Sequence, residues 1–378
     1  MMMKQIYFDN GASSYPKPRN VYENTYDFIC SNGANVGRSS HKMAVEAAEV
    51  VYETRAALSR FFGMRDPEKV VFTMNATHAL NTVLQGYLQK GDHVVTTVME
   101  HNSVLRPLYA MQNRGVELSI ADVDLYDDQK TLQNIKSLIR VNTKAIVVSQ
   151  CSNVCGKMLP IKELSGLKNE RIRLIVDGSQ GAGSIPTDFE KMGMDYYCAP
   201  FHKGMLGLQG GGFALCRYNE LSPLMFGGTG GESIIRDQPD YLPERLEAGT
   251  LPVPSIYSAR EGIRFLEKVG VETVFAHKKK LVRELYRNLS SLPRIEVCAD
   301  YELMQSPGVL SFTVKDSCSE EVGAYLAEKG VAVRAGLHCA PLFHKKMNTE
   351  DCGMVRVSFG FANTMEEIAD FIEILKYF

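Results

Sequence analysis

Short, almost wholly apolar runs alternate with segments of helical periodicity over the first two thirds of the chain. The runs cover residues 69–74, 92–99, 144–150, 172–179 and 211–217. Between them, stretches such as "THALNTVLQGYL" (77–88) carry apolar residues at helical spacing. Nearly continuous apolar strands separated by helices are typical of a mostly parallel sheet that is covered on both faces. The sequence therefore predicts an α/β fold with one large, mostly parallel sheet.

The pattern changes from about Val253. Two long amphipathic segments (256–270 and 274–292) are followed by short apolar runs and a final helical pattern from Met365. Three regions are therefore expected. They are an extended, Pro- and Ser-rich segment that joins the smaller domain (1–19), a large α/β domain (20–252), and a smaller C-terminal α+β domain (253–378).

Charge and hydropathy exclude several classes of partner. The formal net charge of the 378 residues is -2, which gives no sign of nucleic-acid or anionic-membrane binding. No run approaches the roughly 18 apolar residues of a membrane span. The first ten residues, "MMMKQIYFDN", contain no apolar segment of the kind found in secretory signals. We therefore expect a cytoplasmic protein.

The nine cysteines are irregularly spaced and odd in number. This pattern does not favour a disulfide framework, and cytoplasmic thiols stay reduced. Cys151 and Cys155 are the only close pair, but their spacing is not that of a zinc ligand pair and no second pair completes a site. We therefore predict no metal, and we expect most of these thiols to be small buried hydrophobic groups.

Two polar groups stand at strand ends, where α/β enzymes present their chemistry. Lys203 lies between a histidine and a glycine-rich turn, directly after a short apolar run. A partly desolvated lysine can form a Schiff base, although a surface lysine in a flexible loop is the alternative. Asp177 ends an apolar strand. It could pair with a protonated ring nitrogen of a cofactor, or it could simply start a turn or cap a helix.

Two further groups could have either a functional or a purely structural role. Thr77 stands where a strand gives way to a helix, so its hydroxyl and the free helical N–H groups could bind an anion. It could equally be a plain N-cap. His101 follows another strand end and could stack on a flat ring, although a lone histidine is usually structural. Together, the four groups could bind an aldehyde, a protonated pyridine nitrogen, a phosphate and the face of a flat ring. Pyridoxal 5'-phosphate has all four features, so the combination indicates this cofactor.

With these residues in place, the sequence resembles the cysteine desulfurase and selenocysteine lyase family of class V, fold-type I pyridoxal-phosphate enzymes. The resemblance runs through nearly the whole chain, over "IYFDNGAS", "NVGRSSH", "NATHALN", "MEHNSVL", "SQCSNVCG", "VDGSQ", "HKGMLG", "RLEAGT", "RAGLHCAP" and "VRVSFGFANT". It implies a large cofactor-binding domain, a smaller C-terminal domain, and a homodimer with shared active sites.

The resemblance also implies a role for each matching residue. Lys203 would bond to the cofactor aldehyde and act in catalysis, and His101 would stack on the ring as a second catalytic group. The remaining cofactor-binding residues would be His202, Thr77 and Ser179 at the phosphate, Asp177 at the pyridine nitrogen, Gln180 at the ring hydroxyl, and Asn153 facing cofactor and substrate. Arg356 would bind the substrate carboxylate. Thr250 would reach the phosphate in the other subunit.

Cys339 falls on the sulfur-accepting cysteine of the family. "RAGLHCAP" resembles the motif of group II desulfurases, with Leu337 in place of the commoner histidine, and Leu208 stands where proline is common. The implied reaction converts L-cysteine to L-alanine, with a persulfide formed on Cys339 and passed to a possible acceptor protein. His338 and Arg334 are the neighbours expected to favour the thiolate.

Three alternatives remain open on sequence grounds. The first is selenocysteine lyase activity, which uses the same cofactor site and depends less on the cysteine. The second is another class V reaction on a different amino acid, in which Cys339 would be incidental. The third is a scaffold without catalytic activity, which the presence of Lys203, Asp177 and Arg356 argues against.

Overall fold

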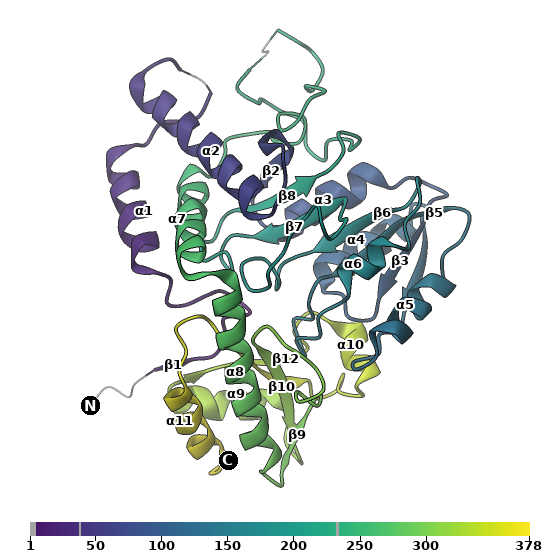
Figure 1. Cartoon of the computed structure of the whole chain (residues 1–378), viewed down its shortest axis with the longest axis vertical. Coiled ribbons are helices and arrows are strands. Elements are labelled where there is room, and N and C mark those ends of the chain that lie inside the picture. The colour runs from purple at the N-terminus through teal and green to yellow at the C-terminus, as the bar shows by residue number, and fades with distance from the viewer. Residues whose placement is uncertain (1–4, 38, 232–233) are drawn as a thin grey trace.

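A seven-stranded sheet forms the centre of the larger part of the molecule, at the top of Figure 1. The computed structural model describes residues 5–37, 39–231 and 234–378. Across the sheet, the strands are β2 (Val70–Thr73), β8 (Gly212–Cys216), β7 (Tyr196–Pro200), β6 (Arg173–Asp177), β5 (Thr143–Ser149), β3 (His93–Thr97) and β4 (Glu117–Ala121). Only β8 runs antiparallel to its neighbours, so the predicted mostly parallel α/β sheet is confirmed.

One of these strands, β4, was not among the predicted runs, and β7 was predicted only as the short apolar run before Lys203. β4 lies at the edge of the sheet and alternates buried with exposed residues, so it lacks the continuous apolar character of the central strands. β7 is wholly buried but short, and it includes two tyrosines and a proline. It is nevertheless the apolar run that precedes Lys203.

Helices cover both faces of this sheet. The helices are α1 (Arg19–Ser31), α2 (Lys42–Phe61), α3 (Ala76–Tyr87), α4 (Asn102–Gln112), α5 (Asp128–Ser137), α6 (Ile161–Ser165) and α7 (Val253–Val269), with a short 3-10 turn at Pro67–Lys69. Leu80 of α3 and Val104 of α4 share one apolar cluster, and residues of α2, α5, α6 and α7 share another. Each face of the sheet is therefore buried, as its apolar strands require.

The smaller part of the molecule, at the bottom of Figure 1, is built on a four-stranded antiparallel sheet. Its elements are α8 (Val271–Ser290), β9 (Ile295–Val297), β10 (Val309–Val314), α9 (Ser319–Glu328), β11 (Val331–Ala332), β12 (Arg334–Gly336), α10 (Pro341–Lys346), β13 (Met354–Ser358) and α11 (Met365–Leu375). The N-terminal strand β1 (Ile6–Tyr7) pairs in parallel with β11. The domain boundaries stay a prediction. The first helix of the expected smaller domain, α7, packs against α1 and α2 of the larger part.

The expectation that every thiol is reduced is wrong at one place. Cys318 and Cys352 form a disulfide, with Cα atoms 4.7 Å apart. Cys318 caps α9 and Cys352 lies just before β13, and the backbone N–H of Ser319 donates to the Cys352 carbonyl at 3.0 Å. The pairing of distant strands brings these cysteines together, so their spacing of 34 residues gave no signal.

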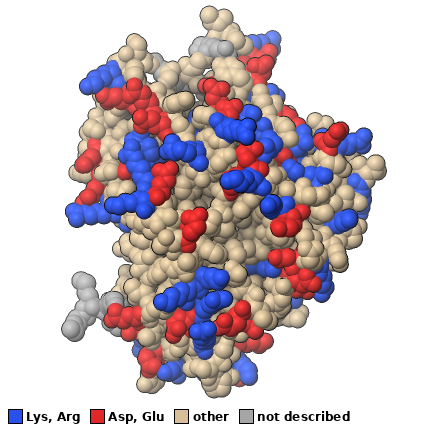
Figure 2. Space-filling view, in the orientation of Figure 1, with Lys and Arg blue, Asp and Glu red and all other residues tan. Residues whose placement is uncertain are grey.

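Charged side chains of both signs are interspersed over the face shown in Figure 2, in keeping with the small net charge. Within the described residues, no helix is long and apolar enough to cross a membrane.

Candidate active site

A cavity of about 110 Å³ lies at the carboxyl ends of the parallel strands. Parallel strands end at the same edge of a sheet, so the segments that follow β5, β6 and β7 converge there. The sequence-predicted residues that line the cavity are Thr77, His101, Asn153, Asp177, Ser179, Gln180, His202 and Lys203. The structure thus brings together all the predicted cofactor-binding residues except Thr250.

A buried amine and a buried carboxylate lie in this cavity. Lys203 follows β7, and burial lowers its pKa to about 8, an effect opposed by the negative charge of Asp177. Asp177 is the last residue of β6 and is 3% exposed. Its Oδ1 accepts a hydrogen bond from the Ser179 N–H at 2.9 Å, so it starts a turn and also faces the cavity. A buried carboxylate requires a positively charged partner, which a protonated ring nitrogen would supply.

Three groups in the lining of this cavity are suited to an anion. Asn75, and not Thr77, is the N-cap of α3, and its Oδ1 accepts from the His78 N–H at 2.9 Å. The Thr77 hydroxyl therefore lines the cavity in the first turn of the helix. Nδ1 of His202 is buried with no hydrogen-bond partner among the described residues. A helix N-terminus, a hydroxyl and an unpartnered imidazole nitrogen together fit a phosphate.

His101 has both of the roles considered for it. It is the N-cap of α4, and its Nδ1 accepts from the Ser103 N–H at 3.0 Å. Burial is the main cause that lowers its pKa to about 4, so the ring is neutral. Because Nδ1 accepts, the ring proton is on Nε2. The capping bond fixes the orientation of the imidazole, which also lines the cavity.

Arg356 lies fully buried in β13 and is held by two groups. Its Nη2 is 2.8 Å from the Asp9 carboxylate, and its Nη1 donates to the Asn153 carbonyl at 3.1 Å. Its Nε has no partner among the described residues. A buried guanidinium that contacts a cavity-lining residue and retains a free donor fits a substrate carboxylate. The sequence prediction missed Asp9, although it is the acid in the quoted motif "IYFDNGAS".

Cys339 is half-buried beside this cavity. Its carbonyl accepts from the Asn102 N–H at 2.7 Å, and the Asn153 side chain donates to the neighbouring His338 carbonyl at 2.7 Å. Nη2 of Arg334 lies 3.7 Å from the Cys339 sulfur. Arg334 therefore contacts the thiol as expected.

The same expectation is wrong for His338. Its ring nitrogens are engaged with His344 and the Arg334 carbonyl, not with the sulfur. Burial is the first cause that lowers the pKa of His338, to about 2, so the ring carries no charge to stabilise a thiolate.

Thr250 lies outside this cavity, and Gln180 lines it with its side-chain amide already engaged. Thr250 is exposed and is not among the residues that line it. The side-chain amide of Gln180 lines the cavity but donates to the Gly11 carbonyl at 3.0 Å. Cys151 also lines the cavity, and burial raises its pKa. No described group of His, Cys, Asp and Glu residues could hold a metal ion.

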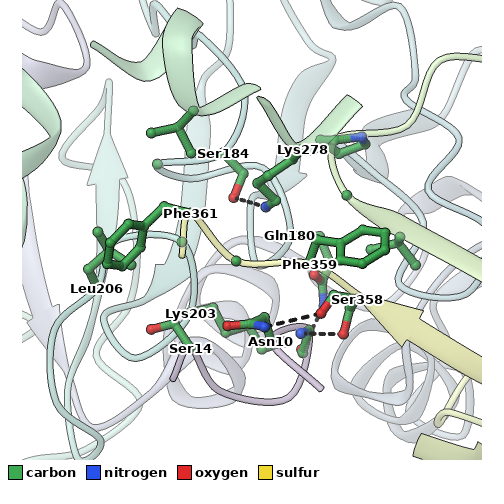
Figure 3. A pocket seen from close by; sticks show the side chains of 18 of the residues that line it. Asn10, Ser14, Gln180, Ser184, Lys203, Leu206, Lys278, Ser358, Phe359 and Phe361 are labelled. Carbon is green, nitrogen blue, oxygen red and sulfur yellow. Dashed lines mark hydrogen bonds between the residues drawn. The ribbon is translucent and has the colours of Figure 1, made fainter. Parts of the chain in front are cut away.

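Lys203 and Gln180 also line a second cavity, of about 30 Å³, between the two parts of the molecule (Figure 3). Lys278 of α8 lies at its upper side and donates to the Ser184 hydroxyl at 3.0 Å. Burial lowers the pKa of this lysine to about 8. Sequence reasoning missed Lys278 because its helical pattern gives no sign of a buried charge.

Comparison with known proteins relates the whole chain to one family. The family model described as "Aminotransferase class-V" matches residues 6–371. A protein from Borreliella burgdorferi named "Probable cysteine desulfurase" is 30% identical over 387 aligned positions, which cover 98% of this chain and 91% of that protein.

Solved structures are also similar to the chain. The apo structure of a cysteine desulfurase from Thermococcus onnurineus NA1 matches with a TM-score of 0.90 and 29% identity, over 99% of this chain and 94% of that chain. The structure of the cysteine desulfurase CsdA from Escherichia coli, in an S-sulfonic acid form, has a TM-score of 0.87 at 24% identity, over 99% and 94% of the two chains, and shares the fold.

Proposed function

Because the chain belongs to the class-V aminotransferase family, we propose that it is a pyridoxal-phosphate-dependent cysteine desulfurase in which Cys339 accepts the sulfur. One observation carries the proposal. Lys203, Asp177 and the N-terminus of α3 converge on one cavity, and residues beside that cavity hold the loop of Cys339.

The residues that line the cavity fit each part of this cofactor. The unpartnered His202 nitrogen, the Thr77 and Ser179 hydroxyls and the start of α3 would hold the phosphate. Asp177 would pair with the ring nitrogen, His101 would lie against the ring, and Lys203 would bond to the aldehyde. When bound, the cofactor supplies an electron sink for the carbanion that forms at the substrate Cα.

Arg356 would orient the amino-acid substrate. Charge-assisted hydrogen bonds from a buried guanidinium to a carboxylate are strong and directional. Asn153 accepts from Arg356 through its carbonyl and donates to the Cys339 loop through its side chain, so one residue connects the carboxylate site to the thiol. The substrate would thereby present its sulfur toward Cys339.

Lys203 and Cys339 would carry the proton transfer and the sulfur transfer. Once the substrate amine has displaced Lys203 from the aldehyde, the free Lys203 amine, whose pKa burial lowers toward neutrality, takes the proton from the substrate Cα as a general base. The Cys339 thiolate then attacks the substrate sulfur. An S–S bond forms, the C–S bond breaks, and its electron pair stays with the substrate carbon, which is protonated to give L-alanine. The guanidinium of Arg334 lies beside the attacking sulfur.

The proposal includes a homodimer. Thr250 is exposed and lies away from the cavity of its own chain. In a dimer with shared sites it would reach the phosphate of the other subunit. Size-exclusion chromatography with light scattering tests this point, and a monomer at micromolar concentration that retains full activity would refute it.

The decisive experiment compares the wild-type enzyme with Cys339→Ala on L-cysteine and on L-selenocysteine, with L-alanine as the measured product. The proposal expects the variant to keep its bound cofactor but to lose alanine formation from L-cysteine. A variant that still desulfurates cysteine would refute the persulfide on Cys339. A wild-type enzyme that forms alanine only from selenocysteine would instead favour selenocysteine lyase activity.

A further inference from the structure

Two buried imidazoles lie behind the loop that carries Cys339. His338 is 2% exposed, and His344 of α10 is fully buried. Their rings stack with centroids 5.4 Å apart, and Nδ1 of His338 is 3.3 Å from Nε2 of His344. Neither ring takes part in the chemistry proposed above, so their burial and pairing need another explanation.

The partners of the two rings fix the direction of every hydrogen bond between them. Nε2 of His338 is 3.1 Å from the Arg334 carbonyl, which can only accept, so this nitrogen carries the proton. In a neutral ring, Nδ1 of His338 is then a bare acceptor and receives the Nε2–H of His344. Nδ1 of His344 in turn accepts from the Thr349 hydroxyl at 2.8 Å.

This hydrogen-bond chain requires a neutral His338, because a second proton, on Nδ1 of His338, would place two donors, that N–H and the Nε2–H of His344, face to face. The surroundings disfavour that charge. Burial first, and then Arg356 and Arg334, lower the pKa of His338, and burial also lowers the pKa of His344 against the opposing influence of Glu350.

The hydrogen bonds from Thr349 through His344 lead to His338, which lies in a strained turn. His338 and Cys339 have φ values of 51° and 57°, in the left-handed region that L residues rarely adopt. Such conformations are unfavourable and persist only where surrounding contacts hold them. The large domain supplies two contacts through Asn153 and Asn102. The smaller domain supplies the histidine pair.

We propose that His344 is a positioning residue for Cys339: with Thr349 it orients His338, and thereby holds the left-handed turn that sets the Cys339 sulfur against Arg334. The inference rests on the proposed role of Cys339 as nucleophile. It predicts that losing the donor at position 344 impairs sulfur transfer but leaves cofactor and substrate binding unchanged.

The test uses two substitutions at one position in the enzyme with its cofactor. His344→Leu puts an apolar side chain in place of the imidazole and removes both ring nitrogens, so Nδ1 of His338 loses its donor. His344→Gln retains an N–H donor and an oxygen acceptor. We expect His344→Leu to lower kcat for L-cysteine about 10- to 100-fold, the scale of a misplaced catalytic group, with KM within twofold. His344→Gln should recover activity to within about fivefold of wild type.

Two further measurements separate positioning from a general structural role. The single-turnover rate of persulfide formation on Cys339, followed by mass spectrometry, should fall with kcat in His344→Leu, while the absorbance of the bound cofactor stays unchanged. Thr349→Val removes only the hydroxyl that donates to Nδ1 of His344, and it should slow persulfide formation about threefold or more. His277→Leu is the matched control, because His277 bonds to the Asn363 carbonyl outside this loop and should leave the rate unaltered.

A His344→Leu enzyme with kcat within twofold of wild type would overturn the inference, and so would a His344→Gln enzyme as slow as His344→Leu. If His344→Leu does not fold, a Thr349→Val enzyme with the wild-type rate would overturn it. These outcomes differ from a failure of the proposed function, in which Cys339→Ala itself would remain active on L-cysteine.

Discussion

Glu100, the neighbour of His101 in the sequence, should make the free energy of unfolding of this protein fall as pH rises. Its carboxyl group is fully buried, and its two oxygens accept from Thr97 Oγ1 at 2.6 Å and Ser149 Oγ at 2.7 Å. Burial raises its pKa from 4.5 to about 7, and the nearby negative charge of Asp177 adds to this effect. The folded protein therefore retains a proton that the unfolded chain releases.

The sign and size of the effect follow from linkage. Between pH 4.5 and 7 the folded state binds more protons than the unfolded state at this position, so the free energy of unfolding decreases as pH rises. Raising the pKa from 4.5 to about 7, at about 1.4 kcal/mol per pH unit, gives a total loss of about 3.5 kcal/mol, complete above pH 7. Substituting Glu100→Gln removes this titration and keeps groups that can bond to both hydroxyls.

The assay is urea denaturation of wild type and Glu100→Gln at several pH values from 5 to 8. Three histidines, the half-buried His101 and His202 and the buried His338, have lowered pKa values and give the opposite slope, with stability lost as pH falls below about 6.5. Subtracting the two proteins cancels that contribution. Between pH 5 and 8 the wild type should lose about 2.5 kcal/mol relative to the variant, because the rest of the loss occurs below pH 5, and a difference that stays constant with pH would refute the reasoning. The exposed Glu163→Gln change is the control.

Three further changes test the active site and the core. Lys203→Ala should lower alanine formation at least about 10³-fold with unchanged far-ultraviolet circular dichroism, since a positioned base contributes this much, and residual activity near wild type would exclude Lys203 as the base. Arg356→Lys should raise KM for L-cysteine about 10-fold or more, because an ammonium cannot replace a planar guanidinium, and an unchanged KM would place the carboxylate elsewhere. Glu247→Ala breaks the Arg55–Glu247 ion pair, whose side chains are each 7% exposed, and should lower the free energy of unfolding by about 3–5 kcal/mol in urea denaturation. A loss below 1 kcal/mol would show that Arg55 finds another partner.

Local pattern predicted much of the candidate site. Asp177, His101 and Lys203 each follow an apolar run, and such runs become strands whose carboxyl ends meet at one edge of a parallel sheet. The fold class and the shared cavity could therefore be inferred before any contact was known. Edge strand β4 could not, because half of its residues face solvent and its pattern is weaker.

Contacts between residues far apart in the chain could not be read in this way. Arg356 pairs with Asp9 across 347 positions, and Asn153 bonds to His338 across 185. Local pattern also gave no sign of the disulfide between Cys318 and Cys352. The same holds for the His338 ring, which bonds to His344 and not to the thiol.

The sequence by itself determined the α/β architecture and placed Lys203, Asp177, Thr77 and His101 near strand ends, because periodicity encodes which face of an element is buried and where a strand ends. Only the tertiary structure decided that Arg334 rather than His338 contacts Cys339, and that a neutral histidine pair supports its loop. Those arrangements depend on how the two parts of the molecule pack against each other. The direction of a side chain in such packing depends on partners that no local pattern specifies.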